Sequence, residues 1–356
     1  MTPSCLVKNE EVLPCALPSG AWLAAAPRGA YTTARTVGGG AAAFELGFHI
    51  NRLASSAALM MQADAAAAGT QAAGPPAAPA AAAEAADAAR LRPRVLAALR
   101  AAVRAYRAAT AHSDGELKLT VLVTWPGSDR GQQAGGQAQP SSGSTDGASA
   151  SDGASKSADA PPAAAAADVY VHVAPLPPRP APPVRVVMRG QPRQNAAAKD
   201  SEWVRQRKAI EQELPPDVNE AVLVGADGAL FEGLTSNVFA VMDGAVHTAG
   251  EGILAGSVRE VVLQVARREG IPVVLEPPRL SDLPRWEGCM ISSTSRLLLP
   301  VDEASVHPEA AAAAASSPLE GRSAPASRTF ERGGVVGRLE QLVLAEIDAC
   351  SEPLFD

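Results

Sequence analysis

Three stretches of the chain contain almost no large apolar side chain, and they limit how much of it can form a core. Residues 69–90 are rich in alanine and proline, residues 127–167 in glycine, serine, aspartate and alanine, and residues 303–332 in alanine and serine. Segments of this composition bury too little apolar surface to offset the entropy lost on ordering. We therefore expect three low-complexity inserts, with the folded unit confined to the other 263 of the 356 residues.

The charge and the apolar runs exclude several classes of protein. The net charge is −7 and the pI about 5.4, so no overall basic field would attract nucleic acid or an anionic membrane. No apolar run reaches the roughly 20 residues that span a bilayer, and the first residues do not resemble a secretory signal or a transit peptide. The four cysteines show no CxxC spacing. We expect a cytoplasmic protein with free thiols, no metal site, no membrane segment and no nucleic-acid partner.

The first half of the chain outside the inserts has clear periodicities. Alternation with β-branched residues predicts strands at residues 30–37, 117–125, 169–173 and 184–188. Apolar residues at helical spacing predict helices at residues 49–62 and 94–111.

The second half contains closely spaced turn signals. Asp-Gly pairs between apolar runs predict hairpins at residues 220–232 and 237–248. Further periodic segments predict helices at residues 201–213, 257–268 and 337–349, and strands at residues 271–275 and 289–292. Strands and helices mix without a regular βαβ order, which predicts the α+β class.

Five short motifs follow one another in a fixed order. They are GAYTTAR (29–35), HINRL (49–53), AAKDSEW (197–203), LFEGLTSNVF (230–239) with ILAGSVRE (253–260), and MISSTSRLLLPV (290–301). This order resembles the class IV pyridoxal-phosphate aminotransferases, which have fold type IV and include the D-amino acid and branched-chain aminotransferases and aminodeoxychorismate lyase. EGLTSNVF is closer to the D-amino acid aminotransferase and aminodeoxychorismate lyase pattern than to the branched-chain one.

The resemblance implies an architecture of two domains. Residues 1–190, with the inserts 69–90 and 127–167, would form an N-terminal α/β domain. Residues 191–356, with the insert 303–332, would form a β-rich, barrel-like domain that binds pyridoxal 5′-phosphate. The cofactor would lie between the domains, and the protein would be a homodimer.

Lys199 and Glu232 match the two residues that the chemistry of the cofactor needs most. A pyridoxal-phosphate enzyme needs a lysine amine to hold the cofactor as an internal aldimine and then to move the substrate proton. Lys199 stands at the family's position, although Asp-Ser-Glu-Trp follows it instead of the commoner apolar or Asn-containing run. Glu232 matches the family glutamate, whose negative charge keeps the ring nitrogen of the cofactor protonated. Taken alone, each residue could equally be a surface charge.

The cofactor phosphate needs several N–H and O–H donors and usually one cation. Arg52 matches the family's phosphate arginine. Ser257 and Val258, which open a predicted helix after a glycine, match its backbone-amide cradle. Ser293 and Thr294 match its second phosphate loop. The plain alternatives are a helix N-cap for Ser257 and a polar loop after a strand for the other two.

Candidate residues on the substrate side are Tyr31, Arg35, Thr235 and Ser236. Tyr31 matches a family tyrosine near the cofactor, and Thr235 and Ser236 resemble residues beside the cofactor and the substrate carboxylate. Arg35 is equally consistent with a carboxylate clamp and with an outward charge on its strand. We expect His49 to be structural and to help set the helix that carries Arg52.

The resemblance therefore implies an aminotransferase that acts on an amino acid and a 2-oxo acid. One alternative is a C–N lyase of the aminodeoxychorismate lyase type, because it would need the same lysine, glutamate and phosphate cradle. The other is a protein that binds pyridoxal phosphate with little turnover.

Overall fold

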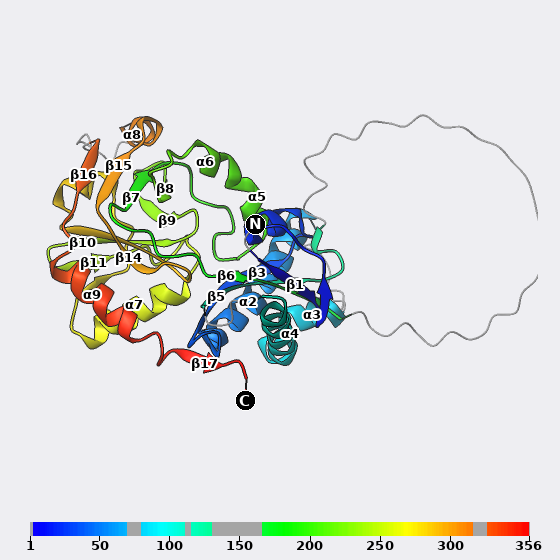
Figure 1. The fold of residues 1–356 in the computed structure, drawn as a ribbon. Helices are drawn as coiled ribbons and strands as arrows, with labels where there is room; N and C mark the ends of the chain where they lie inside the picture. The colour runs from blue at the N-terminus through cyan, green and yellow to red at the C-terminus, as the bar shows by residue number, and fades with distance from the viewer. Residues whose placement is uncertain (1–2, 70–79, 111–114, 130–165, 316–325, 356) are drawn as a thin grey trace, which may run out of the picture.

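A computed structural model of the chain describes residues 3–69, 80–110, 115–129, 166–315 and 326–355 (Figure 1). These residues form two sheets that lie side by side, each covered by helices. The mixture of strands and helices confirms the predicted α+β class.

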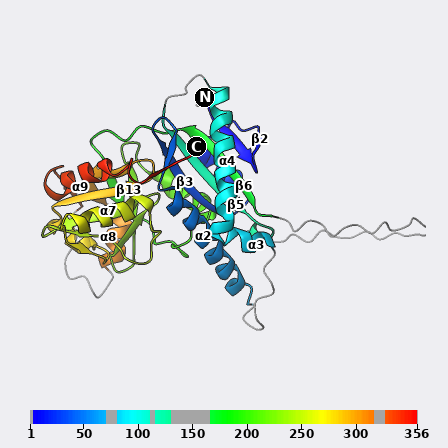
Figure 2. The ribbon, with the colours of Figure 1, turned by 90° about the horizontal axis from the view of Figure 1, so that it is seen from below.

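The first sheet is antiparallel throughout its described strands. Its strands, in spatial order, are β17 (Ser351–Pro353), β4 (Ala42–Phe44), β3 (Ala30–Val37), β5 (Leu117–Thr124), β6 (Asp168–Pro175), β1 (Cys5–Lys8) and β2 (Glu11–Leu13). Helices α2 (Leu46–Ala67) and α4 (Ala88–Ala109) cover one face (Figure 2). The short helix α1 (Ser19–Ala25) contacts β6, and its Trp22 and Leu23 form a second apolar cluster with Tyr31 of β3 and Leu122 of β5.

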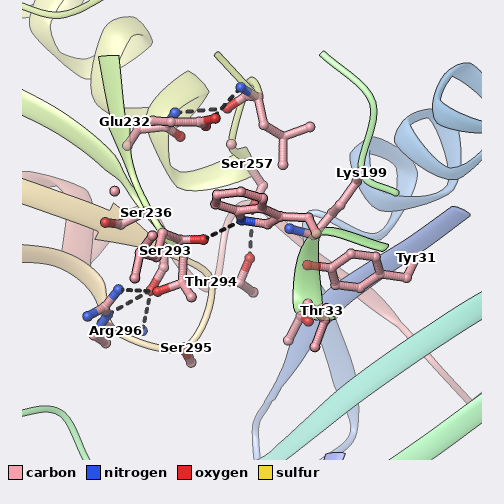
Figure 3. A pocket seen from close by; sticks show the side chains of 18 of the residues that line it. Tyr31, Thr33, Lys199, Glu232, Ser236, Ser257, Ser293, Thr294, Ser295 and Arg296 are labelled. Carbon is pink, nitrogen blue, oxygen red and sulfur yellow. Dashed lines mark hydrogen bonds between the residues drawn. The ribbon is translucent and has the colours of Figure 1, made fainter. Parts of the chain in front are cut away.

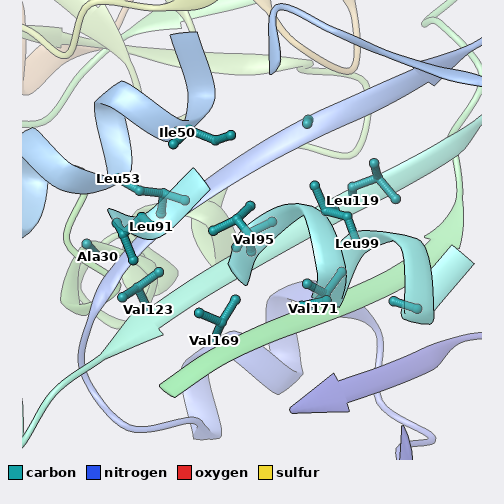
Figure 4. Close-up of a cluster of buried hydrophobic side chains, with 14 of the residues drawn as sticks. Ala30, Ile50, Leu53, Leu91, Val95, Leu99, Leu119, Val123, Val169 and Val171 are labelled. Atoms are coloured by element: carbon teal, nitrogen blue, oxygen red, sulfur yellow. The ribbon is translucent and has the colours of Figure 1, made fainter. Parts of the chain in front are cut away.

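The core of this half lies between the sheet and its two long helices. Figure 4 shows apolar side chains of α2 and α4 packed against β3, β5 and β6. The contacting residues include Ile50, Leu53, Leu91, Val95, Leu99, Leu119, Val123, Val169 and Val171. Because alternate residues of a strand face opposite sides, α2 and α4 leave the other face of β3 and β5 uncovered. Helix α1 covers part of that face, and the rest can line a site.

The second sheet is mixed and branches at β10. Its strands run in the order β12 (Val273–Val274), β11 (Ala245–His247), β10 (Asn237–Met242), β9 (Leu230–Gly233), β8 (Glu220–Val224), β7 (Arg185–Met188), β15 (Glu303–Val306) and β16 (Ser327–Thr329). Strand β13 (Gly288–Ser293) pairs with both β10 and β14 (Leu297–Val301). Helices α7 (Ser257–Arg268) and α9 (Gly334–Ala345) pack on β13 and β14.

Helices or strands form within two of the three predicted inserts, and Ala167 at the end of the third is buried in the first core, which corrects that expectation. Within 69–90, helix α3 (Ala80–Ala85) has buried alanines in the first core. Within 303–332, β15 extends the second sheet beside β7, β16 pairs with β15, and α8 (Pro308–Ala315) follows β15. Alanine has the highest helix propensity, and its small side chain lets helices pack closely, so counting large apolar residues missed these elements. Residues 70–79, 130–165 and 316–325 lie outside the described residues.

Most predicted elements are present, with shifted ends. Helices α2 and α4 begin earlier than predicted, and the predicted helix at 201–213 consists of α5 (Glu202–Gln206) and α6 (Lys208–Glu213). The 3₁₀ helix η2 (Leu280–Arg285) and short strands such as β2, β4 and β17 were not predicted. Three or four residues are too few to reveal a period.

The chain returns to the first sheet after completing the second. Strand β17 pairs with β4, and the Gly47 amide donates to Glu352 Oε1 at 2.7 Å. Leu354 is buried, and its amide donates to the Ala41 carbonyl at 2.9 Å. A division at residue 190 therefore assigns to the second domain a strand that pairs in the first sheet. No helix among the described residues is long and apolar enough to cross a membrane.

Candidate active site

A pocket of about 280 Å³ lies between the two sheets, on the face of β3 and β5 that α2 and α4 leave free. Of the candidates named from the sequence, its lining includes Tyr31, Arg52, Lys199, Glu232, Thr235, Ser236, Ser257, Val258, Ser293 and Thr294. Figure 3 shows Lys199 and Tyr31 on one side and Ser293, Thr294 and Arg296 on the other. Arg35 is not among the lining residues.

Lys199 enters the pocket from a short segment that pairs with the start of β3. The Tyr31 amide donates to the Lys199 carbonyl at 2.9 Å, and the Lys199 amide donates to Ser56 Oγ at 3.0 Å. Lys199 Nζ lies 4.7 Å from the centre of the Tyr31 ring. Burial, together with the charges of Arg52, Arg193 and Arg207, holds the pKa of Lys199 well below its usual value. The structure therefore places a readily deprotonated amine in the pocket.

Glu232 lies at the end of β9 and is paired with a residue that the sequence analysis did not single out. Arg193 Nε donates to Glu232 Oε1 at 2.8 Å, and both side chains are 6% exposed. The Leu254 amide donates to the other carboxylate oxygen at 2.9 Å. Burial raises the pKa of Glu232, while Arg193 opposes that rise. Arg193 lies in the polar run GQPRQN before Lys199, where no periodicity marks it.

Arg52 on α2 is a half-buried cation for which the described residues give no carboxylate partner. Its Nη2 donates to Thr32 Oγ1 at 2.7 Å and lies 3.1 Å from His49 Nδ1. Its Nη1 donates to the Ala255 carbonyl at 3.4 Å, and its Nε is buried without a hydrogen-bond partner. Burial lowers the pKa of Arg52 to about 10. His49 is buried against Arg52 and Thr32, as expected of a structural residue.

The two predicted phosphate loops meet beside Arg52. Ser257 Oγ, in the first turn of α7, lies 3.3 Å from Thr294 Oγ1. Gly256 precedes the helix, and a Cβ atom at that position would lie 2.3 Å from Asn237 Oδ1. Only glycine therefore allows this close approach, which leaves the first amides of α7 at the pocket wall.

Thr235 and Ser236 line the pocket, but their hydroxyl groups donate to a buried carboxylate. Thr235 Oγ1 and Ser236 Oγ donate to Glu220 Oε2 at 2.7 and 3.0 Å. Arg296 donates to the same oxygen, to Thr235 Oγ1 and to Ser293 Oγ. This network joins the second phosphate loop to β8, and the sequence analysis named neither Glu220 nor Arg296.

The cations on the pocket wall formed by β3 and β5 are not Arg35, the one proposed from the sequence. Arg35 lies on the same strand face as Tyr31, but farther along β3 and outside the pocket lining. Lys118, its partner across the β3–β5 register, lines the pocket together with Arg207. Burial and the charge of Arg207 lower the pKa of Lys118. Lys118 is the one charge within the apolar strand LKLTVLVT, a signal that could have identified it.

The arrangement joins a low-pKa lysine amine, a buried carboxylate and an anion cradle in one pocket between two sheets. Among the described residues, no group of three or more His, Cys, Asp or Glu side chains could hold a metal ion. This fold and this pocket are those expected of fold type IV.

Comparisons with known proteins agree with this class. The family described as amino-transferase class IV matches residues 147–304. A putative branched-chain-amino-acid aminotransferase of Methanocaldococcus jannaschii is 39% identical over 88 residues, which are 24% of this chain and 31% of that protein. The match thus spans about a third of the relative's length.

Solved structures share the fold over nearly the whole chain. A hypothetical aminotransferase from Mycobacterium tuberculosis in its PLP-bound form has a TM-score of 0.57 and 20% identity, covering 98% of this chain and 99% of that one. The 4-amino-4-deoxychorismate lyase from Pseudomonas aeruginosa has a TM-score of 0.56 and 16% identity, covering 96% and 99%. Residues 147–304 are thus similar to the class IV aminotransferases, and the chain shares its fold with these solved structures. The preference for the D-amino acid and lyase branch remains a prediction.

Proposed function

We propose that this protein is a pyridoxal-phosphate-dependent aminotransferase that transfers an amino group between an amino acid and a 2-oxo acid. The observation that carries the proposal is the position of Lys199 in the same pocket as Glu232 and Arg52.

The residues around Arg52 fit a phosphate group. Arg52 has a buried Nε without a partner, and Ser257 and Thr294 present hydroxyl groups beside it. The first amides of α7 add N–H donors and the positive end of a helix dipole. Arg52, Ser257, Val258, Ser293 and Thr294 would hold the phosphate.

When bound, pyridoxal phosphate supplies an electron-withdrawing ring that stabilises negative charge at the substrate α-carbon. Lys199 Nζ would bind the cofactor and later accept and return the substrate proton. Its lowered pKa suits both tasks, because only the neutral amine is a nucleophile or a base. Glu232 would keep a proton on the ring nitrogen, and Arg193 helps this buried carboxylate to stay ionised.

The substrate would lie between Lys199 and the free face of β3 and β5. Tyr31 lines this part of the pocket, together with the cations of Lys118 and Arg207. Two cations on this wall favour substrates that carry carboxylate groups. Thr235 and Ser236 would form part of the wall, held in place by their hydrogen bonds to Glu220. Arg35 would not contact the substrate, because it lies outside the pocket lining.

The test of this function is spectroscopic. Purified protein incubated with pyridoxal phosphate should show the visible absorbance band of a lysine-bound cofactor, and Lys199→Ala should abolish it. Lys208→Ala, on an exposed lysine nine positions along, should keep it. A wild-type protein that stays colourless would overturn the proposal.

A single-turnover experiment separates the transaminase from the lyase alternative. A transaminase mixed with an amino donor alone converts its cofactor to pyridoxamine phosphate and releases a 2-oxo acid. A lyase of the aminodeoxychorismate type releases pyruvate and returns pyridoxal phosphate. Bound cofactor with no reaction across a donor panel would favour the binding protein with little turnover.

We also propose the assembly and setting that the family resemblance implies. The protein would have two domains that meet near residue 190, with β7 belonging to the second and β17 returning to the first, and it would act as a homodimer. It would act in the cytoplasm, where its four free cysteines would stay reduced. Sedimentation analysis of the purified protein tests the dimer.

A further inference from the structure

Arg28 has a buried guanidinium that the proposed reaction does not use. It lies two residues before β3, and its side chain is 8% exposed. Its Nη2 donates to Asp200 Oδ2 at 2.7 Å and its Nη1 to Asp64 Oδ2 at 2.8 Å. Burial works against its charge, but the hydrogen bonds that it donates to Asp200 and Asp64 raise the pKa of Arg28. Two carboxylates from distant parts of the chain thus converge on one cation.

One of these carboxylates belongs to the residue directly after Lys199. Around it, residues 199–201 run antiparallel to residues 29–31: the Ser201 amide donates to the Gly29 carbonyl at 3.0 Å, and the Gly29 amide donates to Ser201 Oγ at 3.0 Å. A Cβ atom at position 29 would lie 2.3 Å from the Val123 carbonyl oxygen, so glycine is required where this segment also lies against β5. The Asp-Ser pair that departs from the family run therefore has a structural role here.

The other carboxylate belongs to the helix that supplies the phosphate cation. Along α2, Arg52 lines the pocket, Ser56 accepts the Lys199 amide, and Asp64 binds Arg28. Arg28 therefore joins the phosphate helix to the lysine segment at a point outside the pocket lining.

We propose that Arg28 is a positioning residue for Lys199. Through Asp200 it fixes the Lys199 backbone between β3 and α2, and so sets where Nζ enters the pocket. The inference rests on the proposed function, in which Lys199 does the chemistry. If the contact served only the fold, removing Asp200 and removing Asp64 would affect Lys199 equally.

The matched pair Asp200→Ala and Asp64→Ala tests this preference, because each removes one carboxylate from the same guanidinium. In cofactor-free protein, an amine-acylating reagent is applied across a pH series, and labelling of Lys199 is followed by peptide mass spectrometry. Exposed Lys208 serves as the reference within the same molecule. The pH midpoint of labelling reports the pKa of Lys199 whatever its accessibility. Among the described residues, the charged or titratable groups that interact with Nζ are Arg52, Arg193, Arg207, Glu232, Tyr31 and His49.

Asp200→Ala and Arg28→Met should raise the midpoint towards the ordinary lysine value of 10.5, because Nζ leaves its buried, positively charged surroundings. Asp64→Ala should keep the wild-type midpoint. In the loaded enzyme, Asp200→Ala should lower kcat by about 10²-fold with little change in KM, as a misplacement of about 1 Å does. If Asp200→Ala does not fold, Asp200→Asn replaces it.

An unchanged midpoint in the folded Asp200 variant would overturn the proposal, and so would equal shifts in both aspartate variants. The labelling needs no cofactor, so it can succeed or fail independently of the proposed function. A wild-type protein that never binds pyridoxal phosphate would remove that function and leave the labelling result standing.

Discussion

Arg193 Nε donates to Glu232 Oε1 at 2.8 Å, and this pair closes the end of the pocket that faces β9. Replacing the carboxylate leaves Arg193 buried without its counter-charge. Such a loss destabilises a protein by about 3–5 kcal/mol.

Glu232→Gln should therefore lower stability by about 3 kcal/mol and turnover by about 10²-fold, while cofactor binding persists. The amide keeps the shape of the side chain but cannot hold the cofactor's ring nitrogen protonated. Chemical denaturation and single-turnover kinetics measure the two effects. Asp302→Asn is the control, because it breaks a pair with Arg332 outside the pocket lining. Wild-type turnover in the Glu232 variant would exclude this residue from the mechanism.

The lowered pKa of Lys199 makes the stability of cofactor-free protein depend on pH. Between the lowered folded-state pKa and the unfolded value near 10.5, the unfolded chain binds more protons, so stability rises with pH in that window. Lys199→Met should lack this rise. The difference in Tm between the two proteins across the pH series measures it, and parallel curves would contradict the prediction.

Arg52→Met should weaken the binding of pyridoxal phosphate by about 10- to 150-fold, the equivalent of one charge-assisted hydrogen bond of 1.5–3 kcal/mol. The binding of pyridoxal, which lacks the phosphate, should hardly change. In wild-type protein the contribution should be present at neutral pH and lost as the pH rises through about 10, where Arg52 loses its proton. Equal weakening of both ligands would show that Arg52 supports the fold instead.

Lys118→Met should raise the KM of a 2-oxo acid with two carboxylates by about tenfold, because it removes a cation from the pocket wall. The KM of a 2-oxo acid with an alkyl side chain should change much less. Lys208→Met provides the control for a lysine outside the pocket lining. An equal rise for both substrates would place Lys118 at the carboxylate that all substrates share.

The pocket residues that lie within the family motifs could be predicted from the sequence. Each motif combines a recognisable helix, strand or turn with a residue type that the cofactor chemistry requires. Ser257 and Val258 could be placed because a glycine, a serine and an amphipathic run predict a helix start. The arginines that hold the pocket residues in place could not be predicted. Arg193 and Arg296 lie in polar segments and Arg28 in an alanine-rich loop, and none of the three has a local pattern. Their positions are fixed by contacts far along the chain, such as that between Arg28 and Asp200, which are 172 residues apart.

Arg35 and helix α3 show the two ways in which the sequence misled. Arg35 lies on the predicted strand, where a carboxylate clamp and an outward charge were equally consistent with the sequence. The pocket ends before it, and a strand pattern does not reveal where a cavity ends. The alanines of α3 are buried because neighbouring helices approach closely, which is a property of the packing and not of the segment itself.

The pairing of β17 with β4 also affects how the protein is made. Residues 42–44 are synthesised early and 351–353 some 300 residues later, which at 5–20 residues per second is a delay of roughly 15–60 s. During this interval one edge of the first sheet has no partner, and an open strand edge can pair with another nascent chain. Aggregation during expression should therefore depend on how soon residues 351–353 leave the ribosome.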